Sequence, residues 1–455
     1  MMKNLKLVLA LLLLAVVPYG CMVGPKYVQP EQPKSESFLY GNHSTDTTSS
    51  VRMIKWSTLF NDPVLTGLIE KGLQNNFDLK IAISRLEQAR ANLGVAKADL
   101  YPAFQYSGQI NSGETFFQPN SLLANMSWEI DFWGKYRHQN KAFQNDLLAS
   151  DEARKVVLSD IVSNIAISYF ELRDFDNQLE ITINTLETRQ KAYDIINERF
   201  KSGYVAELDK VQIEQQVAIA EANIPAIKRQ ITALENSISI LIGQVPGPIQ
   251  RGKTNSELLI TSTFPTSVPS ALLENRPDVK GAELLYRSAN ERIGVAQAMR
   301  YPSFNIAALA GFTSVTVADM FDGASYRQNV GAGIAGPLFN FGKNKRRVEV
   351  NRQIAEERKL NFQKAYLTAI SEVENSLQNV AMYKEEWSAR NRQVIAAQKN
   401  YDLSNARYYN GYVSYLEVLD AQRSLFEAQL SLSQLTQKQL SSMIQLYKAL
   451  GGGWN

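Results

Sequence analysis

The chain has 455 residues, of which 45% are apolar and 20% charged, so disorder throughout is excluded. Its 48 Lys and Arg residues nearly balance 45 Asp and Glu residues. Nucleic acid is therefore excluded as the main partner, because phosphate binding needs a concentrated basic face. The only histidines are His43 and His138, and the only cysteine is Cys21. This inventory predicts no disulfide framework, no metal site, no cofactor and no enzyme.

Residues 1–20 are typical of an export signal. Two lysines precede the apolar run 7–17, which is too short to cross a bilayer as a helix. A small residue followed by Cys21 resembles a bacterial lipoprotein signal, in which cleavage precedes the cysteine and its thiol is then acylated. Pro18 stands where such signals usually carry Leu, so an ordinary cleavable signal is the alternative. No later run is long enough for a membrane helix, so any membrane crossing must use strands.

An internal repeat organises the rest of the chain. Residues 75–106 align without gaps to residues 275–306, with 12 of 32 positions identical. Further on the offset becomes 208, since Gly134-Lys135 matches Gly342-Lys343. The second repeat is therefore expected to carry an extra loop before that point. We expect this division: signal 1–20, lipidated extended segment 21–61, first repeat 62–243, linker 244–268 and second repeat 269–455.

Each repeat predicts a helix, two strands, a very long helix, a turn and another helix. Residues 135–200 and 343–409 contain no proline. A strict seven-residue spacing of apolar residues within them predicts coiled-coil packing. At about 1.5 Å per residue such a helix is roughly 100 Å long. A soluble coiled-coil rod would also explain the helices. The track comprises Leu158, Ile165, Leu172, Leu179, Leu186, Tyr193, Phe200, Tyr366, Val373, Val380, Trp387, Val394, Tyr401 and Tyr408.

Two segments with a period of two precede each long helix. They lie around 104–111 and 122–132, and around 304–312 and 330–338. Their length favours transmembrane strands, although a soluble sandwich would give the same alternation. Four strands would leave open edges in lipid, so several chains must contribute: two chains give a filled lumen, three give room for water. In the second segment the polar face comprises Asn125, Ser127, Glu129 and Asp131.

One proline interrupts the predicted helices that follow the turns. Pro225 lies between Val205 and Leu241, where it either bends one helix or separates two shorter ones.

Several motifs, in order along nearly the whole chain, resemble TolC-type outer-membrane efflux proteins of the OprM/NodT-like lipoprotein branch. They are Cys-Met-Val-Gly-Pro at 21–25, Phe-Asn-Asp-Pro at 60–63, Leu-Glu-Asn-Arg-Pro-Asp-Val at 273–279 and Leu-Asp-Ala-Gln-Arg at 419–423. The resemblance implies a mainly α fold with β: a homotrimer with four membrane strands per chain, a long periplasmic α-barrel and an equatorial belt around the linker.

The same resemblance implies a function and partners. The chain would be the lipid-anchored outer-membrane exit duct of a tripartite efflux pump, passively conducting small molecules. A periplasmic adaptor and an inner-membrane transporter, of the RND type, would be its partners. A lipid-anchored coiled-coil scaffold or adhesin without a pore is the alternative.

The candidate gate lies beyond the hairpin turns, which we expect at Gly203 and Gly411 and at the periplasmic tip. Glu417 and Asp420 are three residues apart and share a helix face, so three copies would form an acidic constriction. The resemblance implies that Leu416, Asp420 and Arg423 close the aperture. We also expect Asp209 to accept a hydrogen bond from Tyr408 and to latch the hairpins together. Ordinary solvated charges are the alternative.

Overall fold

The computed structural model describes residues 22–31, 62–111, 119–258 and 276–453. The export signal, Cys21 and His43 lie outside the described residues. The chain divides into two compact units. The first unit takes its described residues from 1–32, 83–153 and 278–365, and the second from 33–82, 154–277 and 366–455. Each unit therefore draws on both predicted repeats.

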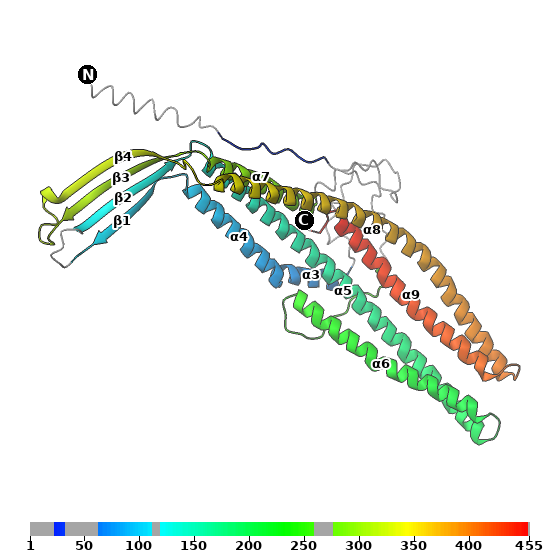
Figure 1. The fold of residues 1–455 in the computed structure, drawn as a ribbon. Helices are drawn as coiled ribbons and strands as arrows, with labels where there is room; N and C mark the ends of the chain where they lie inside the picture. The colour runs from blue at the N-terminus through cyan, green and yellow to red at the C-terminus, as the bar shows by residue number, and fades with distance from the viewer. Residues whose placement is uncertain (1–21, 32–61, 112–118, 259–275, 454–455) are drawn as a thin grey trace. The chain divides into compact units, whose positions relative to one another are not determined.

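The helices recur with equal lengths in the two halves (Figure 1). Helices of 22, 67 and 35 residues in the first half have counterparts of the same lengths in the second. The long α5 and α8 are continuous, as predicted, and α6 contains Pro225 without interruption. The helices are α3 (Pro63–Asn75), α4 (Phe77–Ala98), α5 (Lys135–Lys201), α6 (Glu207–Leu241), α7 (Pro277–Ala298), α8 (Lys343–Tyr409) and α9 (Tyr415–Ala449).

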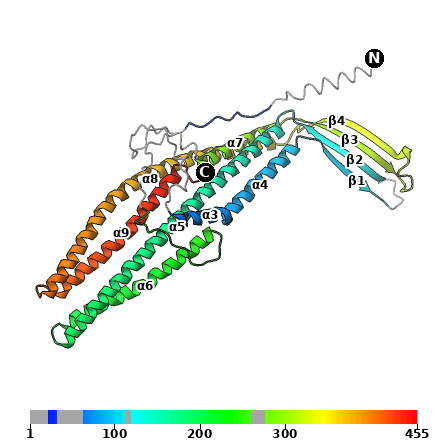
Figure 2. The same cartoon turned by 180° about the vertical axis from the view of Figure 1, so that it is seen from behind.

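One antiparallel sheet in the first unit contains four strands in the order β1-β2-β3-β4. The alternation of polar and apolar residues identified all four, although their ends differ from those predicted. Figure 2 shows that the helices of this unit join the strands at one end of the sheet. The edge strands β1 and β4 each pair with one neighbour. The strands are β1 (Ala103–Gln109), β2 (Asn120–Ile130), β3 (Ser303–Ser314) and β4 (Tyr326–Ala335), with the short η4 (Gly323–Ser325) before β4.

Two predicted strand ends are wrong for identifiable reasons. Asp131 does not continue the polar face of β2, because its carboxylate caps α5 by accepting the backbone N–H groups of Tyr136 (3.0 Å) and Arg137 (2.9 Å). The last strand ends at Ala335, three residues earlier than predicted. Pro337 follows two residues later, and its missing N–H group cannot join a ladder.

The first unit holds the N-terminal segment, residues 22–31, against α7. The Tyr27 hydroxyl donates to Glu283 (2.9 Å), and its ring lies 5.4 Å from that of Tyr286. The amide of Asn290 donates to the carbonyl of Pro25 (3.2 Å). These contacts anchor the chain immediately after Cys21.

His138 is buried against a neighbouring helix. Its ring is 5% exposed, and Nδ1 lies 2.6 Å from a carboxylate oxygen of Glu291. The ring packs on the backbone of α7 at Gly294, where a Cβ atom would lie 2.5 Å from it. A glycine at this position therefore lets α5 and α7 approach closely.

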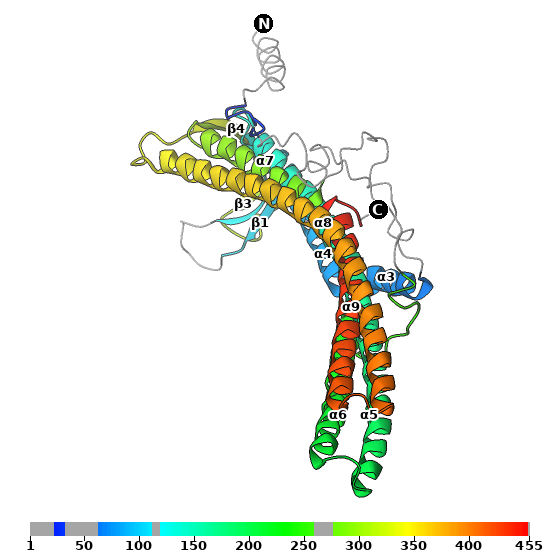
Figure 3. The same cartoon turned by 90° about the vertical axis from the view of Figure 1, so that its right-hand side faces the viewer.

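In the second unit the seven-residue track contributes to the core, as its spacing predicts. All 14 positions are buried or half-buried, and Ile165, Leu172 and Val373 are fully inaccessible. The pairs α5–α6 and α8–α9 lie side by side in this unit (Figure 3). None of the helices in the described ranges combines the length and the apolar character needed to cross a bilayer.

Candidate functional site

Two equivalent turns close the helical hairpins of the second unit. Gly203 joins α5 to α6 with φ of 77°, and Gly411 joins α8 to α9 with φ of 79°. In each turn the next residue donates its N–H back into the last helical turn, from Tyr204 to Arg199 (2.9 Å) and from Tyr412 to Arg407 (3.0 Å). Positive φ and this back-bond are the usual helix C-terminal motif, which favours glycine. Gly203 and Gly411 therefore lie in the turns between the two helices of each hairpin.

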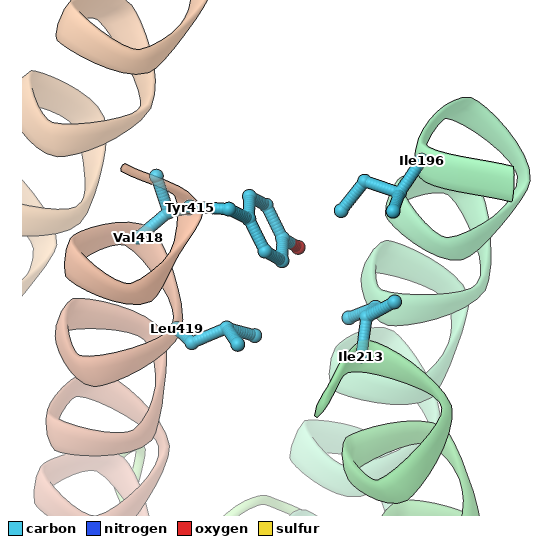
Figure 4. Packing of buried hydrophobic residues seen from close by; sticks show 5 residues of the cluster. All are labelled: Ile196, Ile213, Tyr415, Val418 and Leu419. Atoms are coloured by element: carbon cyan, nitrogen blue, oxygen red, sulfur yellow. The ribbon is translucent and has the colours of Figure 1, made fainter. Parts of the chain in front are cut away.

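An apolar cluster fastens the two hairpins together near these turns. Ile196 from α5 and Ile213 from α6 face Tyr415 and Leu419 from α9, as Figure 4 shows, and Val418 from α9 completes the cluster. All five side chains are at most 4% exposed. Burial raises the pKa of Tyr415 above its ordinary value, so the phenol stays neutral in this cluster.

A polar contact between α5 and α8 lies beside this cluster. The guanidinium of Arg199 donates to the Tyr408 hydroxyl (3.2 Å) and lies over the Tyr408 ring, 5.3 Å from its centroid. The same ring packs edge-on against Tyr415 at 5.1 Å. Tyr408 thus joins the apolar cluster to a cation on the other hairpin.

The expected hydrogen bond between Asp209 and Tyr408 is absent from the described residues. Arg199 binds Tyr408 instead, since its guanidinium donates a hydrogen bond to the Tyr408 hydroxyl and lies over the ring. The carboxylate of Asp209 makes no hydrogen bond or ion pair within the described ranges. The structure therefore places Tyr408 at the contact between hairpins, but with Arg199 in the role expected of Asp209.

The two acidic residues beyond the second turn are each matched by a base. Asp420 forms an ion pair with Arg423 one turn along α9, and Glu417 lies 3.8 Å from Arg407. These four side chains are at least half exposed, and Leu416 is also exposed. Surface pairs of this kind contribute little stability. Within one chain the predicted acidic constriction is thus electrostatically balanced.

One cation of α5, Arg189, is buried. Arg189 is 1% exposed and donates to the carbonyl of Gln216 (2.8 Å). Its guanidinium lies 5.4 Å from the centroid of the Phe426 ring. No carboxylate of the described residues binds it, and its Nε has no partner there. Burial lowers the pKa of Arg189 below its ordinary value.

Two small cavities open along the same hairpins. One of about 230 Å³ and one of about 210 Å³ are both lined by Thr188, Tyr401 and Gln422, from α5, α8 and α9. Their lining is largely polar or aromatic. Within the described residues no group of three or more His, Cys, Asp or Glu side chains could hold a metal ion.

Sequence reasoning missed Arg189 and Arg199 as candidate residues. Arg199 carried a signal, because the repeat pairs it with Arg407 at the same distance from a turn glycine. Arg189 carried none, since a single arginine in a charged helix is usually solvated.

The profile of the family described as "Outer membrane efflux protein" matches residues 68–244 and 268–452. The "Cation efflux system protein CusC" of Escherichia coli strain K12 is 29% identical over 441 residues, covering 95% of this chain and 96% of that protein. The "Probable efflux pump outer membrane protein TtgC" of Pseudomonas putida is 30% identical over 466 residues, covering 99% and 96%.

Solved structures share the fold over nearly the whole chain. A crystal structure of CusC superposes with a TM-score of 0.84 at 29% identity, covering 95% of this chain and all of that one. The open state of the Neisseria gonorrhoeae MtrE outer membrane channel superposes with a TM-score of 0.85, covering 96% and 99%. At 24% identity this second likeness shows the fold alone. With matches to the family profile in both halves and relatives spanning almost its full length, the chain belongs to the outer membrane efflux protein family.

Proposed function

We propose that three copies of this chain form the exit duct of a tripartite efflux pump in the outer membrane. The observation that carries the proposal is the four-stranded antiparallel sheet with two unpaired edges, β1 and β4. In lipid each unpaired backbone group costs several kcal/mol, so β4 of one copy pairs with β1 of the next. Three copies supply twelve strands, enough for a water-filled lumen.

The strand faces support this arrangement. All seven residues of β1 and all ten of β4 are exposed in the single chain. Asn125 on β2 donates to Ser107 on β1 (3.2 Å), so the polar face continues from strand to strand. A continuous polar face suits a water-filled interior, with the other face toward lipid.

The hairpin turns then form the periplasmic gate. Tyr408 and Arg199 link the hairpins within each copy, while Leu416, Glu417, Asp420 and Arg423 remain exposed and available to the neighbouring copies. Release of the Tyr408–Arg199 contact frees α8 and α9 to move away from α5. A periplasmic adaptor that binds the parted hairpins better than the closed ones shifts the equilibrium toward the open duct.

The duct conducts passively, and an inner-membrane transporter of the RND type selects the cargo. Relatives of almost equal identity are named for cation efflux and for an efflux pump of Pseudomonas putida. The substrate class therefore follows the transporter and not the overall fold of the duct.

The test is the mass and conductance of the purified full-length protein. We expect a particle of three chains that opens single channels in planar bilayers. A monomer, or a membrane-bound trimer without conductance, would refute the duct and favour a lipid-anchored scaffold.

A further inference from the structure

The connection between β4 and α8 exposes large apolar side chains. Leu338 is 104% exposed, Phe339 77% and Phe341 90%. The two phenylalanine rings contact each other, with centroids 4.6 Å apart. Three exposed apolar residues in four positions are unusual on a surface that faces water.

Unpaired basic residues follow at once. Lys343, Lys345 and Arg347 make no side-chain hydrogen bond or ion pair within the described ranges, whereas Arg346 binds Glu349 at 2.6 Å. We call the exposed apolar and unpaired basic side chains together the junction patch: Leu338, Phe339, Phe341, Lys343, Lys345 and Arg347.

At the corresponding junction of the first repeat, the basic side chains are neutralised by ion pairs. There Lys135 forms an ion pair with Glu129 (2.9 Å), and Arg137 with Asp131 (3.0 Å). Both acids come from the end of β2 or the residue just beyond it, and both bases from the start of α5.

The second repeat keeps the bases and lacks the acids. At the offset of 208, Lys343 and Lys345 occupy the basic positions, while the acidic positions hold Pro337 and Phe339. The two junctions occupy corresponding positions of the sequence repeat but differ in charge. Only the second presents a cationic surface.

Two features of the junction patch are energetically unfavourable in the single chain. Basic residues crowd the N-terminus of α8, whose first turn has no acid, so they oppose the helix dipole. Phe341 has φ of 51°, the only positive value among the described non-glycine residues. Strained backbone of this kind clusters at ligand-binding and other functional sites.

Aromatic residues place this junction at a membrane boundary. At the ends of the strands that join the helices, the Trp133 ring stacks on Tyr301 at 4.6 Å, and Tyr101 is 71% exposed. At the other ends, the Phe312 ring contacts those of Tyr326 and Phe321 at 5.7 and 5.5 Å. Aromatic belts at both ends of the strands are typical of outer-membrane proteins.

We propose that the junction patch binds the headgroups of anionic phospholipids in the periplasmic leaflet. This inference rests on the proposed function only in that the strands must span the outer membrane. The phenylalanine and leucine side chains enter the boundary between headgroups and acyl chains, and the three bases bind lipid phosphates. A groove of about 280 Å³ at the junction is lined by Arg347 together with Tyr301 and Trp133. Its acids, Glu129 and Asp131, are already paired, which leaves Arg347 free to bind a phosphate.

The test counts lipids bound to the full-length protein purified in neutral detergent. The protein is mixed with phosphatidylglycerol and phosphatidylcholine of identical acyl chains, and bound lipid is measured by native mass spectrometry. Each base near an anionic surface contributes about a fivefold gain in affinity. We therefore expect Lys343→Gln/Lys345→Gln/Arg347→Gln to lower the affinity for phosphatidylglycerol about a hundredfold. Phosphatidylcholine binding should change little.

The matched control removes the same charge from exposed positions in the second unit: Lys228→Gln/Arg229→Gln/Lys399→Gln. It should retain the preference for phosphatidylglycerol. Phe341→Ser should weaken the binding of both lipids equally, because the ring contacts acyl chains and not the phosphate.

Three results would overturn the inference. The triple variant could keep the parent's preference, or inorganic phosphate could displace phosphatidylglycerol, or the triple variant could fall apart into monomers, which would assign the patch to a neighbouring copy. A trimeric, conducting parent without lipid preference refutes this inference alone. A parent that never conducts refutes the proposed function, whatever it binds.

Discussion

Tyr408→Phe isolates the polar contact between the hairpins. The substitution removes only the hydroxyl that accepts from Arg199 at 3.2 Å. The ring remains, so its packing on Tyr415 and its contact with the guanidinium are retained. A hydrogen bond to a charged donor contributes about 1.5–3 kcal/mol when buried, and about 1 kcal/mol at this partly exposed site.

In a trimer the free energy lost by Tyr408→Phe is counted once for each copy. If all three copies must release the contact before the duct opens, the loss is about 3 kcal/mol per trimer. The ratio of open to closed duct then rises by about a hundredfold. Single-channel recording of purified protein in planar bilayers measures this ratio directly from dwell times.

Tyr409→Phe is the matched control. Tyr409 is the next residue on α8, and its ring is 54% exposed. Its hydroxyl makes no hydrogen bond within the described ranges, so its removal should leave the dwell times unchanged. Asp209→Ala should also have little effect on them. Equal dwell times for Tyr408→Phe and the parent, or a strong effect of Asp209→Ala, would refute the assignment of this contact to the gate.

Three further perturbations test other features. Gly294→Ala should lower the free energy of unfolding by about 1–2 kcal/mol, because its Cβ would lie 2.5 Å from the His138 ring. The repeat counterpart Gly94→Ala meets nothing within 4 Å and should raise the free energy of unfolding by about 1 kcal/mol. Equal shifts in Tm for the two variants would contradict the packing. Burial raises the pKa of Asp174, which accepts hydrogen bonds from Gln178 (2.7 Å) and Ser433, so its charged form is disfavoured in the folded state. Stability of the parent relative to Asp174→Asn should therefore fall as pH rises above 3.8, the ordinary value, in melting curves from pH 4 to 7. Cys21→Ser with a processable signal should still fractionate with the outer membrane, since the strands hold the protein there; full release into the periplasm would count against membrane-spanning strands.

Features with local causes could be predicted from the sequence. The spacing of seven in residues such as Ile165 and Val373 is a property of one helix, so it indicated the buried face directly. Gly203 and Gly411 could be predicted as turns because positive φ there depends on the residue itself. Both the family resemblance and the repeat depend on such local patterns.

Contacts between distant segments could not be predicted in the same way. Asp209 and Arg199 are both within reach of a turn in the sequence, and only the placement of α8 against α5 decides which one contacts Tyr408. His138 meets Glu291 across 153 residues, a pairing that no spacing indicates. The end of β2 was misplaced because Asp131 fits a polar strand face and a helix cap equally well.

The interleaving of the two repeats has a consequence for biosynthesis. The second unit closes only when residues from near the C-terminus arrive, as when Ser159 donates to the carbonyl of Gly452 (2.8 Å), 293 positions away. The pairing of β2 with β3 likewise waits for Ser314, some 190 residues after Asn120. Contacts between residues so far apart in sequence slow folding. The chain loses the conformational entropy of the intervening loop before the stabilising contacts form. A ribosome-bound or half-translocated chain thus has no complete core, and neither half expressed alone has one. An outer-membrane protein that completes its core only late can cross the inner membrane unfolded.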